Sequence, residues 1–328
     1  MKILILNHAE VAQLLSMAEC IEVMAEALAD LSAGRMHQPL RSIVRPPDAI
    51  GLMGLMPSYR AGAHALYGLK AVCVFPGNPA LGKDAHQGSV MLFSADTGEL
   101  LALLNASAIT AIRTGAVSAV ATRLLARADA GDLAILGTGV QARSHLAAIA
   151  CVRPIRRVRV ASRSFEHARA FAEEHAPRYS FPIEPASGVE AAVRGADLIV
   201  TATTAAEPIL FREWIAPGAH INAVGSSIAT TREIDTAIMA NAELYVDRRE
   251  STLNEAGDYL FAMRAGAIGP DHIRAEVGEL LLGTQPGRSA SEAITLFKSL
   301  GLAVEDLAAA DHVYRQAQAR GVGTWVEF

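Results

Sequence analysis

The sequence predicts an α/β protein built around a doubly wound parallel sheet, together with a second domain that has strands of its own. From Asp132 onward, short apolar strands alternate with helical stretches at the spacing typical of a parallel sheet covered by helices. A length of 328 residues corresponds to about two domains at roughly 150 residues each. Since 51% of the residues are hydrophobic and only 19% are charged, the chain can bury large cores.

Residues 1–105 are predicted to combine one helix with an antiparallel or mixed sheet. Apolar residues recur at helical spacing from Met17 to Leu28 and Gly34 follows, which predicts a helix over residues 16–31. Strands are expected in the apolar runs at residues 50–56, 66–75 and 89–93. Turn chemistry at residues 96–98 (Asp-Thr-Gly) predicts a β-hairpin over residues 90–104.

A long helix is expected over residues 108–127, with Ser107 as its N-cap. Its small residues, among them Ala111, Gly115 and Ala119, would let another backbone or a ligand come close. The parallel sheet follows, with strands expected at residues 133–136, 158–161, 181–184, 198–202, 219–224 and 244–246. Helices are expected from the glycine-rich turn at residues 137–142 to about residue 151, and at residues 165–175, 189–194 and 303–320.

Charge and cysteine content exclude several classes of protein. The net charge of −5 and a pI near 6.1 give no electrostatic reason to expect a nucleic acid or an anionic membrane as partner. The apolar residues 3–6 are too few for a signal sequence, and no run of about 18 apolar residues exists. The three cysteines are far apart, which argues against a disulfide scaffold or a metal site and favours a cytoplasmic protein.

A dinucleotide-binding motif is expected at residues 137–142, where Gly137, Gly139 and Ala142 directly follow a strand and open a helix. Gly137 would allow the tight turn, Gly139 would let a diphosphate approach the backbone, and Ala142 would let the helix pack closely on the strand. The helix N-terminus would then offer N–H groups to the diphosphate. An ordinary glycine-rich turn between a strand and a helix is the alternative.

The residues after the second strand indicate which dinucleotide binds. An NAD site usually has a carboxylate there for the ribose hydroxyls. This chain has Ser162, Arg163 and Ser164 instead, which can donate hydrogen bonds to a 2′-phosphate. The sequence therefore favours NADP(H) over NAD(H), unless Arg163 is only a solvated surface residue.

Three cations stand in apolar surroundings in the first domain. Arg41 and Lys70 interrupt apolar stretches, and Arg113 lies near the start of a helix of small residues. Buried cations need anions, supplied either by acidic side chains or by a ligand carboxylate. For the three together we expect an anionic substrate. His86 could move a proton near neutral pH, although a single histidine is more often structural.

These residues make the chain resemble the ornithine cyclodeaminase/mu-crystallin family over nearly its whole length. The resemblance rests on motifs in the same order at residues 39–41, 54–57, 68–70, 110–114, 137–142, 217–225, 297–301 and 304–306. It implies a homodimer in which residues 1–115 and 304–328 bind substrate and dimerise. Residues 116–303 would form an inserted Rossmann domain.

The resemblance also implies roles for individual residues. Arg41, Lys70 and Arg113 match the cations that bind the substrate carboxylate, and Gln87 falls where cyclodeaminases carry a substrate-contacting threonine. Lys70 or His86 would supply a proton. The positions expected to line the cofactor are Thr114, Gly137, Thr138, Gly139, Val140, Gln141, Ala142, Ser162, Arg163, Ser164, Thr201, Ala202, Thr203, Val224, Gly225 and Ser226.

One departure from the family pattern indicates which of the family's activities this chain has. Cyclodeaminases and archaeal-type alanine dehydrogenases have an aspartate where this chain has Ser227, and a hydroxyl cannot replace an ionised carboxylate near a substrate amine. The resemblance therefore favours reduction of a cyclic ketimine carboxylate, Δ1-pyrroline-2-carboxylate or Δ1-piperideine-2-carboxylate, with NADPH. The alternatives are an ornithine cyclodeaminase or alanine dehydrogenase, and a non-catalytic protein that binds NADPH and a small ligand.

Overall fold

The computed structural model describes residues 2–328, and the chain divides into two units. Unit 1 comprises Met1–Arg113 and Leu302–Phe328, and unit 2 comprises Thr114–Gly301. The bounds expected from the sequence were 1–115 with 304–328, and 116–303. One helix, α3 (Ala106–Leu125), runs through the division at residue 113.

Unit 1 contains a mixed eight-stranded sheet in the order β16-β1-β7-β6-β5-β4-β2, with β3 paired to β4. Strand β1 runs parallel to β7, and the other pairs are antiparallel. The predicted hairpin is confirmed as β6 and β7. The strands are β1 (Lys2–Leu6), β2 (Met36–His37), β3 (Ser42–Val44), β4 (Leu52–Arg60), β5 (Leu66–Val74), β6 (His86–Ser94), β7 (Leu100–Asn105) and β16 (Thr324–Glu327).

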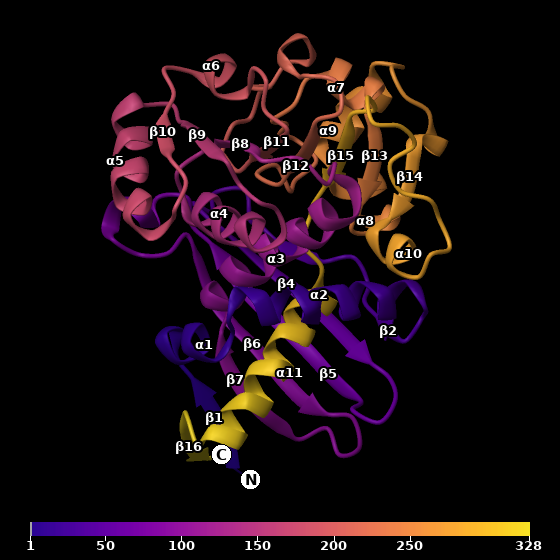
Figure 1. Ribbon diagram of the computed structural model, residues 1–328. Helices are drawn as coiled ribbons and strands as arrows, with labels where there is room; N and C mark the ends of the chain where they lie inside the picture. Colours follow the sequence, from indigo (N-terminus) through magenta and orange to yellow (C-terminus); the bar gives the residue numbers. More distant parts are fainter. Residues whose placement is uncertain (1) are drawn as a thin grey trace. The chain divides into compact units, whose positions relative to one another are not determined.

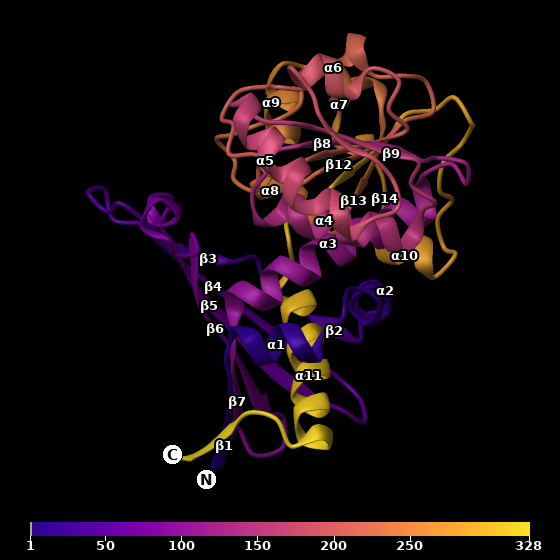
Figure 2. The same ribbon diagram turned by 60° about the vertical axis from the view of Figure 1, so that its left-hand side comes forward.

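Three helices cover one face of this sheet: α1 (His8–Leu14), α2 (Met17–Ser32) and α11 (Ala303–Arg320). Figure 1 shows α11 in yellow crossing β4, β5 and β6. A Cβ at Gly68 would lie 2.8 Å from Leu307 Cδ1, so any larger residue would push the Leu307 side chain aside where α11 packs on β5. Figure 2 shows the opposite face of β4–β7 without a covering helix. A short 3₁₀ helix, η1 (Asn78–Leu81), lies between β5 and β6.

Unit 2 is the predicted doubly wound sheet, with eight parallel strands in the order β10-β9-β8-β11-β12-β15-β13-β14. Alternate residues of β8 enter two separate cores, one on each face, as in a sheet covered by helices on both sides (Figure 2). The strands are β8 (Asp132–Leu136), β9 (Arg157–Ala161), β10 (Ile183–Pro185), β11 (Leu198–Thr201), β12 (His220–Ala223), β13 (Glu243–Val246), β14 (Ile273–Glu276) and β15 (Thr295–Lys298).

The α-helices of unit 2 after α3 are α4 (Val140–Val152), α5 (Phe165–His175), α6 (Val189–Val193), α7 (Thr236–Asn241), α8 (Arg249–Glu255), α9 (Gly257–Arg264) and α10 (Val277–Leu281). Short 3₁₀ helices are η2 (Ala176–Arg178), η3 (Arg212–Trp214) and η4 (Pro270–His272). Strands β14 and β15 were not predicted. β15 comes last in the sequence of this sheet, yet it pairs between β12 and β13.

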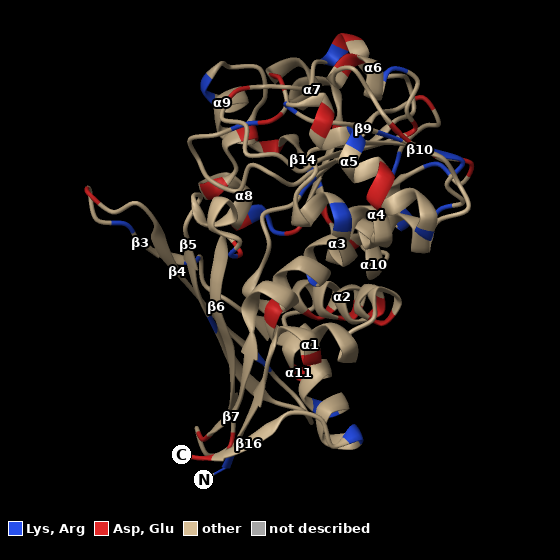
Figure 3. Cartoon of the chain, turned by 90° about the vertical axis from the view of Figure 1, so that its left-hand side faces the viewer, with Lys and Arg blue, Asp and Glu red and all other residues tan. Residues whose placement is uncertain are grey.

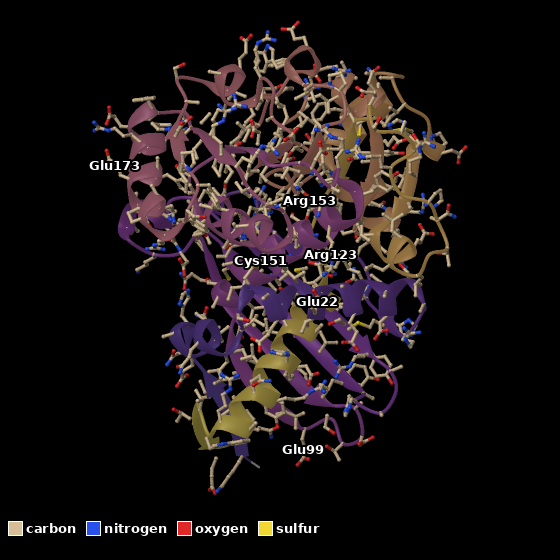
Figure 4. The ribbon with its side chains drawn as sticks, viewed as in Figure 1. Glu22, Glu99, Arg123, Cys151, Arg153 and Glu173 are labelled. Carbon is tan, nitrogen blue, oxygen red and sulfur yellow. The ribbon has the colours of Figure 1, made fainter. Side chains whose placement is uncertain are left out.

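The prediction that Ser107 caps α3 is wrong. The helix begins at Ala106, and the Asn105 side chain accepts a hydrogen bond from Ala108 N at 3.0 Å. The Ser107 hydroxyl instead donates to the carbonyl of His86. At the other end of α3, Arg153 (labelled in Figure 4) donates to the carbonyls of Thr122, Arg123 and Ala126, which satisfies the last turn and places a cation at the negative end of the helix.

Within residues 2–328, α3 is the one helix that is long and apolar enough to cross a membrane by length and composition alone. In the structure 72% of the most apolar stretch of α3 is buried, and buried core helices commonly have this length and composition.

Candidate functional site

The glycine-rich turn at residues 137–142, here called the cradle, joins β8 to α4 in unit 2. Gly137 has φ of 111°, and a Cβ there would lie 2.4 Å from Ala202 O, so only glycine fits this turn. Gly139 has extended backbone and precedes α4, and a Cβ there would meet no atom within 4 Å. The structure thus leaves open space beside the second glycine of the motif.

The start of α4 fits an anion. Its N-cap residue, Gly139, makes no side-chain cap hydrogen bond, and the N-terminus of such a helix attracts anions. Ala142 is fully buried in the core under β8 and β9, as expected for the third position of the motif. Open space beside Gly139 and an uncapped helix of 13 residues together fit the diphosphate of a dinucleotide.

The end of β9 carries the residues that face the ribose in dinucleotide folds of this kind. Residues 162–164 contain no carboxylate, and Arg163 is exposed. Ser162 and Ser164 are half-buried, and Ser164 is the N-cap residue of α5.

Two loops expected to line the cofactor are tied together by one buried carboxylate, Glu233. Its Oε1 accepts hydrogen bonds from the backbone N and the hydroxyl of Thr203, both at 2.7 Å. Its Oε2 accepts from the Thr201 hydroxyl and from Gly225 N, also at 2.7 Å. Burial raises the pKa of Glu233, while the Thr203 and Thr201 hydroxyls oppose this shift.

A buried ion pair between Lys298 and Asp258 lies beside Glu233 and the Ser226 backbone. Lys298 Nζ, at the end of β15, lies 2.8 Å from Asp258 Oδ2 and donates to the carbonyl of Ser226. Asp258 Oδ1 accepts from Glu233 N at 2.8 Å. The hydroxyls of Thr201 and Ser226 are used inside the protein, so these two predicted cofactor-lining residues act on the loops through internal hydrogen bonds.

Unit 1 brings two of the predicted cations together around one acid of α11. Lys70 Nζ lies 3.1 and 3.2 Å from the two carboxylate oxygens of Asp306. Arg113 Nε lies 3.0 Å from Asp306 Oδ1, and its Nη1 lies 2.9 Å from Glu305 Oε2. All four side chains are at least 95% buried.

Arg41 and His86 lie near this cluster. Arg41 is half-buried, and its positive charge contributes to lowering the pKa of Lys70. Val90 of β6 pairs with Lys70 of β5, and His86 lies earlier in β6 at an even spacing from Val90. Side chains alternate between the two faces of a strand, so His86 and Lys70 share the helix-covered face of the sheet. Desolvation of the ring, followed by the charges of Lys70 and Arg113, lowers the pKa of His86.

Gln87 is not brought to the cluster within unit 1. Adjacent strand residues point to opposite faces, so Gln87 lies on the face opposite to His86 and Lys70. Its side-chain amide donates to Asp84 O at 2.9 Å. Ser227 is half-buried and Thr114 is buried, both in unit 2.

Sequence reasoning missed the acids that organise both sites. Glu305 and Asp306 belong to a motif of the resemblance, but their pairing with Arg113 and Lys70 spans about 190 to 240 positions and has no local signal. The available clue was that charged residues stand in the apolar start of the 303–320 helix. Glu233, Asp258 and Lys298 gave no comparable sign.

A model of the ornithine cyclodeaminase/mu-crystallin family matches residues 1–321. The ketimine reductase mu-crystallin of Mus musculus is 44% identical over 297 residues, 90% of this chain and 90% of that protein. Among solved structures, the Thermococcus litoralis Δ1-pyrroline-2-carboxylate reductase, in complex with NADH and L-proline, is 38% identical with a TM-score of 0.95, covering 98% of this chain and 99% of that chain. An archaeal alanine dehydrogenase, described as a dimer with bound NAD, is 32% identical with a TM-score of 0.94, covering 100% of both chains.

Proposed function

The chain belongs to the ornithine cyclodeaminase/mu-crystallin family, and on this premise we propose that it reduces a cyclic ketimine carboxylate with a nicotinamide nucleotide. The substrate is Δ1-pyrroline-2-carboxylate or Δ1-piperideine-2-carboxylate, and the product is proline or pipecolate. The observation that carries this proposal is the buried group of Lys70 and Arg113, with Arg41 beside it, because such a group of cations binds a carboxylate.

The cations of the cluster favour a carboxylate ligand. Lys70 and Arg113 lie beside Asp306 and Glu305, and the positive charge of Arg41 acts on the same place, since it contributes to lowering the pKa of Lys70. A substrate carboxylate is attracted by these cations and is held in a fixed orientation beside its C=N bond. When bound, the nicotinamide supplies the hydride that the imine carbon accepts.

Reduction also consumes a proton at the imine nitrogen, and Lys70 is the better donor of the two candidates. Burial lowers the pKa of Lys70 to about 8, so the ammonium is still mostly protonated at neutral pH. The pKa of His86 is lowered from 6.5, so its imidazole is mostly neutral there and is a weak source of protons.

Ser227 favours reduction over oxidation of an amino acid. Oxidative deamination needs a base that takes a proton from the substrate amine, and a serine hydroxyl is a poor base near pH 7. Once the imine nitrogen is protonated, reduction needs only orientation and hydride, which a serine at this position does not impede.

We further propose a preference for NADP(H) over NAD(H). It is supported by Arg163, Ser162 and Ser164 at the end of β9, where a 2′-phosphate would find donors and no carboxylate to repel it. A nicotinamide nucleotide of either kind fits the cradle beside Gly139.

We also propose that the chain forms a homodimer through the open face of the unit 1 sheet. Rows of apolar residues cross this face, among them Pro57, Leu69, Met91 and Leu103 in one row and Tyr59, Tyr67 and Phe93 in the next. Tyr67 is 50% exposed and Met53 is 42% exposed. Figure 3 shows β5, β6 and β7 with almost no Lys, Arg, Asp or Glu. An apolar face of this extent is typical of a subunit interface.

The expected assembly is a dimer at micromolar concentration, measured by sedimentation velocity. A Leu69→Glu variant, which places a charge in the middle of the open face, should sediment as a monomer. A monomeric wild-type chain would contradict this part of the proposal.

The catalytic proposal is tested by a panel of substrates. NADPH or NADH is mixed with each cyclic ketimine carboxylate, and loss of the reduced nicotinamide absorbance is followed; L-ornithine and L-alanine are offered with the oxidised nucleotides, and ammonia is measured. We expect turnover with the imines. At low nucleotide concentration we expect this turnover to be faster with NADPH than with NADH. Ammonia and proline from ornithine with inert imines would refute the proposal, and tight NADPH binding without any turnover would identify a binding protein.

A further inference from the structure

Asp306 stands out because one carboxylate serves two of the substrate-binding cations. Its Oδ1 is 3.1 Å from Lys70 Nζ and 3.0 Å from Arg113 Nε, and its Oδ2 is 3.2 Å from Lys70 Nζ. Asp306 is 1% exposed and stands in the first turn of α11. A carboxylate this deeply buried is shielded from bulk solvent, so its hydrogen bonds hold the two partners in one relative orientation.

The start of α11 is itself fixed to the sheet and to its own backbone. The Ser58 hydroxyl of β4 donates to Ala303 O at 3.2 Å, and the Gln38 side chain accepts from Val304 N at 3.0 Å. Glu305 Oε2 accepts from Leu302 N at 3.1 Å while it also accepts from Arg113. Asp306 is therefore mounted on a rigid element, as a positioning group must be.

Asp306 leaves a donor on Lys70 for a ligand. An ammonium has three N–H donors, and the two oxygens of Asp306 take at most two of those of Lys70. The Arg113 guanidinium meets Asp306 through Nε and Glu305 through Nη1, so the two acids fix the plane of its fork. Asp306 thus orients both cations at once.

We infer that Asp306 is the positioning residue of the substrate-carboxylate site, which holds Lys70 and Arg113 in register and keeps Lys70 in its charged form. This inference rests on the proposed function for the identity of the substrate. Asp306 acts through the two cations and does not itself bind the carboxylate, because two carboxylates would repel each other.

The charges around Lys70 give this role a distinct pH signature. Burial lowers the pKa of Lys70, and Asp306 of α11 opposes that shift. Arg113 of α3 and Arg41, which precedes β3, lower it further, and His86 of β6 also lies close enough for its pKa to respond to Lys70. Without the Asp306 charge, Lys70 loses its proton at a lower pH.

The test compares an Asp306→Asn variant with an Asp311→Asn variant. Asp311 is also a buried aspartate of α11, and it pairs with Arg60 at 2.7 Å and with Arg315, away from the cluster. The wild type should lose turnover as the pH rises through about 8, in step with Lys70. In Asp306→Asn the alkaline limb of kcat/KM should move to lower pH by about one unit or more, and in Asp311→Asn it should stay.

Binding is measured separately from turnover, by calorimetric titration with pyrrole-2-carboxylate, a planar carboxylate with no C=N bond to reduce. Asp306→Asn should weaken this binding by about tenfold or more, and Asp311→Asn should not. Wild-type binding without any imine turnover would refute the proposed function and leave the role of Asp306 measurable. A folded Asp306→Asn protein with unchanged affinity and an unchanged pH profile would refute the inference.

Should Asp306→Asn fail to fold, Asp306→Glu serves in its place. It keeps the charge and lengthens the side chain by one methylene, so the alkaline limb should stay near that of the wild type while affinity for pyrrole-2-carboxylate falls. Unchanged affinity in Asp306→Glu would contradict a positioning role.

Discussion

An Arg113→Ala variant is expected to lose between about 30-fold and about 4,000-fold in kcat/KM for cyclic ketimine carboxylates, while it keeps its affinity for the nicotinamide nucleotide. Truncating one partner of a buried, hydrogen-bonded charge pair costs about 2–5 kcal/mol, and each 1.4 kcal/mol is a factor of about ten. The change also removes one of the positive charges of the proposed carboxylate site, so the site attracts a substrate carboxylate less strongly.

The same substitution leaves Glu305 and Asp306 buried with less compensation, so the thermal unfolding temperature of the variant should fall. Arg113→Lys keeps the charge and loses the planar fork, and it should lie between the wild type and Arg113→Ala in kcat/KM. Arg35→Ala is the matched control, because Arg35 also pairs with an aspartate, Asp30, but is 58% exposed. If Arg113→Ala is folded, binds NADPH and reduces the imines at the wild-type rate, the assignment of the carboxylate site is wrong.

Local patterns predict the parts of the fold in which neighbouring residues decide the structure. The helices expected at residues 165–175 and 303–320 are found as α5 and α11 with the same bounds, since periodicity and flanking residues mark their ends. The N-cap of α3 shows the limit of such patterns, because Asn105 and Ser107 are both good cap residues and the hairpin that ends at Asn105 decides between them.

Residues that pair across long stretches of sequence could not be predicted from local patterns. Lys298 ends an apolar strand that was not expected, and its partner Asp258 is 40 residues away, so neither position alone indicates a buried ion pair. The cations show the opposite case. Their placement in apolar surroundings predicted that anions would meet them, and for the three cations together the expected anion was a substrate carboxylate. The structure pairs Lys70 and Arg113 with the acids Asp306 and Glu305, which the sequence could not show.

Replacing Gly139 with alanine is expected to abolish most nucleotide binding without unfolding the protein. A Cβ at this position meets no protein atom within 4 Å, and the extended backbone accepts any residue, so thermal stability should stay within about 1 kcal/mol of the wild type. The added methyl group stands in the space that a diphosphate would occupy beside the N-terminus of α4. Affinity for NADPH and for NADH should fall together by about tenfold or more, measured by fluorescence titration of the reduced nucleotide.

Three further variants test the parts of this site, and the last of them is a control. Gly137→Ala forces a side chain onto a backbone with φ of 111° and against Ala202 O at 2.4 Å, so it should lower stability by about 1–3 kcal/mol or more as well as binding. Arg163→Ala should weaken NADPH and leave NADH unchanged, whereas Arg169→Ala, an exposed arginine of α5 that pairs with Glu166, should change neither. A Gly139→Ala protein that binds both nucleotides as tightly as the wild type would place the diphosphate elsewhere, because the methyl group can be accommodated only if nothing else needs that space.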